Sequence, residues 1–287
     1  MIIDVHNHPD YHGYSPERFL QNMDENGVDK TFLLSWEAPV TDYDPASKHL
    51  LSPHSDDPIP FLSCVHYYEK APDRFYLGFS PDPRQPNAIE RLKAMTMLYD
   101  IKLCGEFKLR MVFDDPDALR MFRYCGEIGL PVLVHIDYEF DAAGSYPWPN
   151  YWYGGGIEAF GRALEACPDT IFLGHAPGFW AHISGDGQHI TKAYPRGPVV
   201  PGGQIQALLE RCPNLYCDIS AHSGYNALNR DPEHAKTFLT QYQDRVVFGR
   251  DCFETWHRTF LDNAGLPADV LEKIYCGNVN RICRLGL

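Results

Sequence analysis

The 287-residue sequence predicts an α/β fold, a single (β/α)8 barrel of the TIM type, on three observations. Short runs rich in Val, Ile, Leu and Phe alternate with segments of helical apolar spacing along the whole chain. There are eight such runs, and strands separated by helices pair in parallel through right-handed crossovers. The length fits one such barrel, which takes about 250 residues. We therefore expect one domain over residues 1–287, with a doubly wound open sheet as the structural alternative.

Each apolar run has the length and the Val, Ile and Phe content of a buried strand. The expected strands span residues 2–6, 30–36, 75–80, 101–109, 131–136, 170–175, 215–220 and 245–251.

Six segments between these strands have the apolar spacing of an amphipathic helix: 15–27, 87–100, 115–129, 156–168, 202–213 and 231–243. Ser15 can cap the first helix, and Gly27 follows its end. Asp114 or Asp115 can cap the third, which ends at Gly129.

Two long connections, 36–60 and 175–203, follow the second and the sixth expected strands. Loops of this length are uncommon unless they have a function, and both leave the C-terminal ends of strands. We expect them to form the walls and the lid of a pocket for a small-molecule substrate.

The formal net charge of -13, with no cluster of Lys or Arg, argues against nucleic acid as a partner. No run approaches 18 apolar residues, and the N-terminus lacks the apolar core of a signal peptide. We therefore expect a cytoplasmic protein with no membrane partner. The nine cysteines form no CxxC pair and are expected to be reduced thiols.

The first expected strand ends in two histidines, His6 and His8. Because side chains alternate along a strand, both point to the same side. Three further strands end in a residue that can bind a metal, namely His135, His175 and Asp251. In a closed barrel all five side chains converge at the C-terminal mouth. Imidazole and carboxylate groups in such a cluster predict a divalent-metal site.

This pattern resembles the amidohydrolase superfamily, and within it the branch of aminocarboxymuconate-semialdehyde decarboxylase-like proteins. The resemblance rests on the DxHxH start, the two later strand-end histidines, the FGRD segment at 248–251 and the closing IYCGNVNRICRL at 274–285. It implies a metal-dependent barrel enzyme in which His6, His8, His135 and Asp251 are ligands. It makes His175 a ligand or a polarising group beside the substrate.

The fourth expected strand contains Glu106 and Lys108, which alternation places on one face. In many members of the superfamily a Lys or Glu on this strand bridges two metal ions. We favour Glu106 as the ligand, because it is anionic without modification, with Lys108 as its charge partner or a substrate contact. A structural ion pair inside the barrel is the alternative. Arg250, which precedes Asp251, should point away from the metal and have no catalytic role.

The expected cofactor is one or two divalent metal ions per chain, zinc first and manganese as the alternative. The expected reaction is hydrolysis of an amide, lactone or related carbonyl substrate by metal-activated water. Asp251 would accept and return the proton, and His175 would stabilise the oxyanion. Non-oxidative decarboxylation of a carboxylated substrate is the alternative, and a metal-binding barrel without catalysis is a third.

Three further residues are candidates for contact with the substrate. Tyr138 and Trp180 follow two of the strand-end histidines, and His222 follows the seventh strand close to Asp218. The remaining loop histidines, His12, His54, His182 and His189, are expected to be solvated. The sequence leaves the substrate and the oligomeric state open, a homo-oligomer included.

Overall fold

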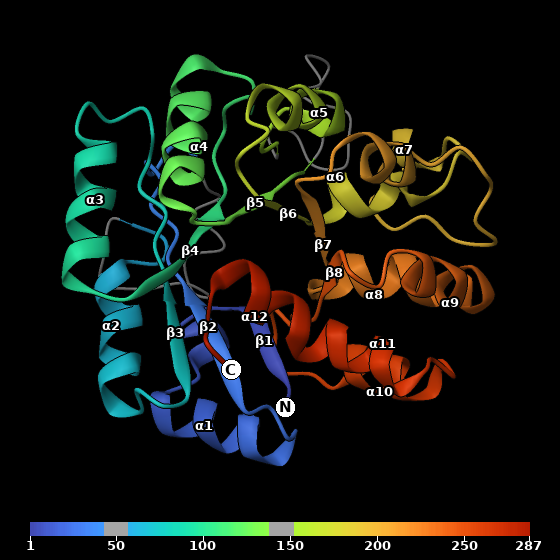
Figure 1. Cartoon of the computed structure of the whole chain (residues 1–287), viewed down its shortest axis with the longest axis horizontal. Coiled ribbons are helices and arrows are strands. Elements are labelled where there is room, and N and C mark those ends of the chain that lie inside the picture. Colours follow the sequence, from blue (N-terminus) through green and yellow to red (C-terminus); the bar gives the residue numbers. More distant parts are fainter. Residues whose placement is uncertain (43–56, 138–151) are drawn as a thin grey trace.

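The computed structural model describes residues 1–42, 57–137 and 152–287. Eight parallel strands form one sheet in which the spatial order follows the chain order (Figure 1). They are β1 (Ile3–Asn7), β2 (Lys30–Leu34), β3 (Phe75–Gly78), β4 (Ile101–Phe107), β5 (Val132–His135), β6 (Phe172–His175), β7 (Leu215–Asp218) and β8 (Val246–Val247). Each overlaps its expected range, so the strand prediction is confirmed.

Backbone hydrogen bonds bring the first and last strands together. The N–H of Val5 donates to the carbonyl of Phe248 at 3.0 Å, and the N–H of Asp251 donates to the carbonyl of His6 at 2.7 Å. The sheet is therefore a nearly closed barrel, as predicted, and the open-sheet alternative is wrong.

Helices connect the strands and surround the barrel (Figure 1). They are α1 (Pro16–Glu25), α2 (Phe61–Lys70), α3 (Ala88–Leu98), α4 (Pro116–Ile128), α5 (Gly156–Ala166), α6 (Pro177–Trp180), α7 (Gln204–Arg211), α8 (Ala221–Asn229), α9 (Pro232–Gln241), α10 (Trp256–Asn263), α11 (Ala268–Glu272) and α12 (Asn278–Cys283). All six expected helices are present. The helix α2, which follows the connection 36–60 in the sequence, was not predicted.

The expected caps are present as well. The Ser15 hydroxyl accepts a hydrogen bond from the N–H of Arg18 at 3.3 Å, and Asp115 caps α4 through the N–H of Asp117 at 2.8 Å. Gly129 ends α4 with φ 68°, a left-handed conformation that favours glycine.

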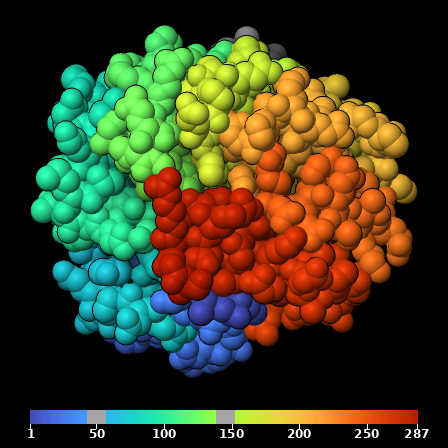
Figure 2. Space-filling model, viewed as in Figure 1, coloured from blue at the N-terminus to red at the C-terminus, as the bar shows by residue number. Residues whose placement is uncertain are grey.

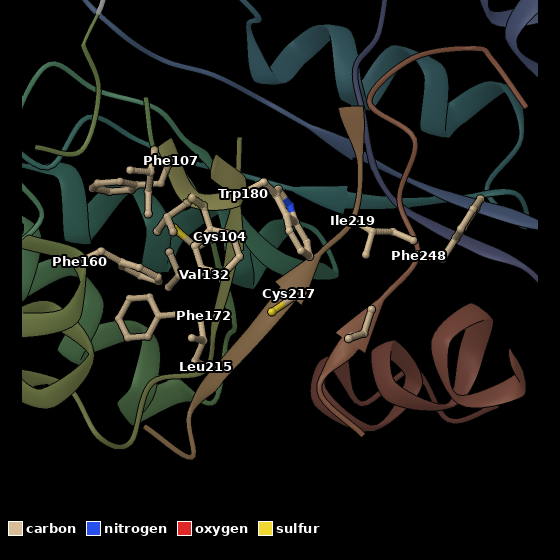
Figure 3. Close-up of a cluster of buried hydrophobic side chains, with 14 of the residues drawn as sticks. Cys104, Phe107, Val132, Phe160, Phe172, Trp180, Leu215, Cys217, Ile219 and Phe248 are labelled. Atoms are coloured by element: carbon tan, nitrogen blue, oxygen red, sulfur yellow. The ribbon is translucent and has the colours of Figure 1, made fainter. Parts of the chain in front are cut away.

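The larger part of the core lies between the strands and the helices. Figure 3 shows Phe107 of β4, Phe160 of α5 and Phe172 of β6 packed in this layer, together with Trp180. Burial of these aromatic side chains from consecutive strand–helix units holds the helices against the barrel wall.

A second apolar cluster fills the inside of the barrel. It joins inward residues of the strands, such as Leu103, Leu133 and Leu173, to Val279 and Ile282 of α12. In Figures 1 and 2 the C-terminal segment, coloured red, lies across the centre of the molecule. Because α12 packs at the end where the strands begin, the opposite end carries the residues that follow the strands.

Two further observations concern the chain as a whole. No helix in the described part of the chain is both long and apolar enough to cross a membrane. All nine cysteines are free, and eight of them are buried.

Candidate metal centre

The two histidines of the first strand meet at its C-terminal end, as predicted. Their Nε2 atoms are 3.3 Å apart, and both side chains are buried. The Nδ1 atom of His6 lies 2.8 Å from the Asp218 carboxylate, and Nδ1 of His8 lies 2.9 Å from the carbonyl of Leu34. Since both partners only accept hydrogen bonds, the proton of each neutral ring is assigned to Nδ1. Each Nε2 therefore presents a lone pair to the space between the two rings.

His175, the last residue of β6, points into the same space. Its Nδ1 atom lies 2.9 Å from the Ser220 hydroxyl and 3.2 Å from Asp218 at the end of β7. Its Nε2 atom is buried and has no hydrogen-bond partner among the described residues. Because unpaired buried polar atoms are rare, this nitrogen is suited to a ligand that the protein itself does not supply.

Glu106 of β4 lies between all four histidines. One carboxylate oxygen is 3.4 Å from Nε2 of His8, and the other is 3.8 Å from Nε2 of His6 and 4.0 Å from Nε2 of His175. That second oxygen is also 2.5 Å from Nδ1 of His135. A single carboxylate thus lies within 4.0 Å of a ring nitrogen of each of the four histidines.

The second nitrogen of His135 has its own carboxylate partner, since Nε2 lies 2.9 Å from Asp137. Both ring nitrogens of His135 thus face carboxylate oxygens, and a metal ion bound at Nδ1 would replace the hydrogen bond to Glu106. A histidine that donates its other N–H to a carboxylate is the usual arrangement of a metal-bound imidazole.

Asp251 completes the cluster from the segment after β8. Its carboxylate oxygens lie 3.4 Å from Nε2 of His8 and 3.6 Å from Nε2 of His175. Its backbone has φ 49°, a left-handed conformation that is costly for a residue other than glycine. At 14% the Asp251 side chain is the most exposed of the six, so it faces the open end of the barrel.

These donors fit one or two metal ions. They form two groups, His6 with His8 and Asp251, and His135 with His175 and Glu106, and within each group the ligand atoms lie within 4.8 Å of one another. Two atoms bound to one ion at about 2.1 Å are about 3.0–3.4 Å apart, close to several of the distances above. Nitrogen lone pairs that face one another and face carboxylate oxygens repel unless a positive charge, a proton or a metal ion, lies between them.

The electrostatics of the metal-free cluster lead to the same conclusion. Burial acts to lower the pKa of His8 and of His175, but hydrogen bonds and charges from neighbouring carboxylates outweigh it and raise each pKa to about 10. Burial acts to raise the pKa of Asp251, but the histidines hold it well below its usual range. The site therefore attracts positive charge, and protons compete with metal for it.

Lys108 lies just beyond the end of β4, where strand alternation no longer applies. The pairing of β4 with β5 shifts register between Cys104 and Phe107. The Lys108 ammonium lies 4.7 Å above the ring of Trp36 and 5.1 Å from the ring of Tyr153, and its charge helps to lower the pKa of Glu106. It is therefore near the site, on the side of β2 and β4.

The prediction that Trp180 contacts the substrate is wrong. Its side chain is 1% exposed, and its indole N–H donates to the carbonyl of Asp218 at 2.8 Å. Figure 3 shows it among the buried hydrophobic side chains. The sequence position just beyond His175 suggested the pocket, but the short helix α6 turns the indole into the core.

His222 is exposed at the start of α8, where a substrate could reach it. Its ring lies 4.9 Å from Tyr194 and 5.8 Å from Trp256 between ring centres.

Tyr138 and His54 lie outside the described residues. His182 is partly buried and not freely solvated as expected: its ring packs 4.2 Å from that of His189, and burial lowers its pKa to about 3.

Arg250 points away from the cluster, as predicted. Its guanidinium pairs with Asp4 at 2.8 Å and donates to Asn22 of α1 at 2.8 Å, so it ties β1, β8 and α1 together. The preceding Gly249 passes so close to the site that an added Cβ would lie 2.6 Å from Asp218 and 3.2 Å from the Cβ of His6. A side chain at 249 would therefore displace the cluster.

The residues that orient the histidines were not predicted from the sequence in that role. Asp218 carries the same signal as the predicted ligands, since it ends an apolar strand, yet its role depends on the neighbours that it meets. Asp137 was recognisable only as a carboxylate two residues beyond His135.

A nearly closed barrel with histidines and carboxylates at its mouth defines a class of protein, the metal-dependent TIM-barrel enzymes. The comparison with protein families agrees with this class. The model of the amidohydrolase family matches residues 3–285, so the chain belongs to the amidohydrolase family and is a metal-dependent enzyme. No curated protein matches it significantly.

Many solved structures share the fold. An uncharacterised TIM-barrel protein from Bordetella bronchiseptica is 18% identical, with a TM-score of 0.65 over 99% of this chain and 98% of that one. A dihydroxybenzoic acid decarboxylase from a Polaromonas species, with bound manganese and 2-nitroresorcinol, is 13% identical, with a TM-score of 0.61 over 100% and 97%. A probable 2-pyrone-4,6-dicarboxylic acid hydrolase from Acinetobacter baumannii is 11% identical, with a TM-score of 0.62 over 99% of each chain. At these identities the likeness establishes the fold alone.

Proposed function

We propose that the protein is a hydrolase that uses metal-activated water on a small-molecule amide, lactone or related carbonyl substrate. The observation that carries the proposal is the position of Glu106. Its carboxylate lies 3.4 Å from His8 in one group of ligand atoms and 2.5 Å from His135 in the other. A carboxylate that reaches both groups favours a bridge between two metal ions, an arrangement common in hydrolytic sites.

The ligands would be His6, His8 and Asp251 on one side and His135 and His175 on the other, with Glu106 between them. A bound divalent ion lowers the pKa of water to about 7 and so supplies hydroxide at neutral pH.

Asp251 is placed to accept the proton of the attacking water and to return it to the leaving group. It is the most exposed of the candidate ligands, and the neighbouring histidines keep it ionised. Of the two roles predicted for His175, full burial favours that of ligand over that of an oxyanion-stabilising residue. Lys108, whose ammonium lies beside Trp36 near the site, and the exposed His222 are the candidates for contact with the substrate.

Non-oxidative decarboxylation of a small carboxylated substrate is the second candidate. A decarboxylase and a probable hydrolase are both among the proteins of similar fold. Decarboxylation needs one metal ion to orient the carboxylate and a group to protonate the remaining carbon. Zinc is the proposed metal, and manganese is the alternative because these histidine and carboxylate ligands suit both ions.

Metal analysis and a substrate screen together test the proposal. We expect purified protein loaded with zinc or manganese to hold two equivalents per chain, and Glu106→Gln to hold fewer. In 18O-labelled water, hydrolysis places the label in the product, whereas decarboxylation releases carbon dioxide without incorporating water. Release of carbon dioxide with no 18O in the organic product would overturn the hydrolase proposal in favour of the second candidate.

A further inference from the structure

The turn after β1 carries a tyrosine, Tyr11, that lies beside the metal centre. Its ring meets that of His8 edge to face, with the ring centres 5.7 Å apart. Because His8 is a candidate metal ligand, this contact places the Tyr11 ring beside the cluster. The ring packs against the hydrophobic core while remaining partly exposed.

The Tyr11 hydroxyl has no hydrogen-bond partner in the part of the chain that the structure describes. In the described part of the chain the hydroxyls of buried tyrosines have protein partners: Tyr67 binds Asp10, Tyr153 donates to the carbonyl of Asp42, and Tyr275 donates to Asp262. Buried tyrosines usually find such a partner. An unpaired phenol at the mouth of the barrel therefore has its donor available to a ligand.

The backbone around Tyr11 is held in an unusual conformation. Both flanking residues are left-handed, Asp10 with φ 60° and His12 with φ 51°. Such conformations are costly and persist where the surroundings enforce them, often at functional sites.

Tyr67 of α2 is the residue that enforces this conformation. Its hydroxyl accepts from the N–H of Asp10 at 2.9 Å and reaches the Asp10 carboxylate at 2.9 Å and the carbonyl of Tyr14. Tyr14 is fixed in turn, because its ring stacks on Phe253 with the centres 3.5 Å apart. The turn is thus anchored on both sides of Tyr11.

We propose that Tyr11 is a catalytic residue that donates a hydrogen bond from its phenol to an oxygen atom of the bound substrate, and that Tyr67 positions it. The inference rests on the proposed function, since it assumes a substrate oxygen beside His8 and Asp251. A phenol is protonated at neutral pH, so Tyr11 has an O–H to donate. Such a donor serves an oxyanion or a carboxylate equally well.

The test uses cobalt-loaded protein and acetohydroxamate, a small ligand whose oxygens bind metal and accept hydrogen bonds. The visible spectrum of cobalt reports binding without the need for a known substrate. We expect Tyr11→Phe to bind cobalt as the unaltered protein does and acetohydroxamate about tenfold or more weakly, as for loss of a hydrogen bond to a charged acceptor. Tyr124→Phe, on α4, is the matched control and should change neither affinity.

The outcomes separate the inference from the proposed function. Equal acetohydroxamate affinity in Tyr11→Phe and the unaltered protein would overturn the role of Tyr11 and leave the metal centre standing. Failure of the unaltered protein to bind cobalt would overturn the proposed function, and the inference with it.

A double-mutant cycle tests the positioning role. Tyr67→Phe should weaken acetohydroxamate binding in the unaltered background and have no further effect in Tyr11→Phe. Equal losses in both backgrounds would assign Tyr67 a structural role only.

Discussion

Asp218→Asn tests whether the histidines of the site are held ready for a metal. Both oxygens of the Asp218 carboxylate accept hydrogen bonds. One receives Nδ1 of His6 at 2.8 Å and the Ser220 hydroxyl at 2.6 Å, with Nδ1 of His175 at 3.2 Å. The other receives the N–H of Ser220 at 2.9 Å. An asparagine of the same shape would turn its NH2 group towards donors on one side or the other.

The expected loss follows from the number of histidines involved. Removing the carboxylate partner of one metal-binding histidine typically costs about 10- to 100-fold in metal affinity. Asp218 orients both His6 and His175, so we expect a loss of at least about 100-fold, or about 2.7 kcal/mol.

A competition titration with a chromogenic chelator measures this loss. Asp244→Asn is the control, because the Asp244 side chain is 64% exposed and lies in the turn before β8. If Asp218→Asn bound zinc as tightly as the control, the histidines would not depend on Asp218, and the tautomer assignment behind the metal site would fail.

The remaining predictions concern protons, backbone space and the core. His8 and His175 have pKa values raised to about 10 in the metal-free protein, so metal binding at pH 7 should release up to about two protons, and affinity should rise with pH. Calorimetry in two buffers of different ionisation enthalpy measures the release, and identical heats would contradict it. By the same linkage, protonation of these rings stabilises the metal-free fold below about pH 6.5, and this stabilisation is lost as the pH rises through about 10. Gly249→Ala should lower metal affinity more than tenfold, because its Cβ would lie 2.6 Å from Asp218; unchanged affinity would show that the site can move. Trp180→Phe should reduce the free energy of unfolding by about 1–3 kcal/mol through its unpaired partner carbonyl, with acetohydroxamate affinity unchanged. Weaker acetohydroxamate binding at unchanged stability would restore Trp180 to the pocket.

Much of the fold was readable from the sequence because its signals are local. The eight apolar runs and the caps at Ser15 and Asp115 depend on neighbouring residues and on strand and helix periodicity. The helix α2 was missed because it follows a long polar connection and starts at Phe61 without a side-chain cap.

The metal ligands were also readable, since each ends an apolar strand, and parallel strands in a closed barrel bring such ends together. What the sequence could not supply is the set of contacts between strands. Asp218 acquires its role only because β7 lies where its carboxylate meets the rings of His6 and His175. The positions of Lys108 and Trp180 likewise depend on backbone turns just beyond the strands, where period-two alternation ends. The tertiary structure alone decided which side chains orient the site and left the Tyr11 hydroxyl available, because hydrogen bonds between distant residues depend on three-dimensional packing.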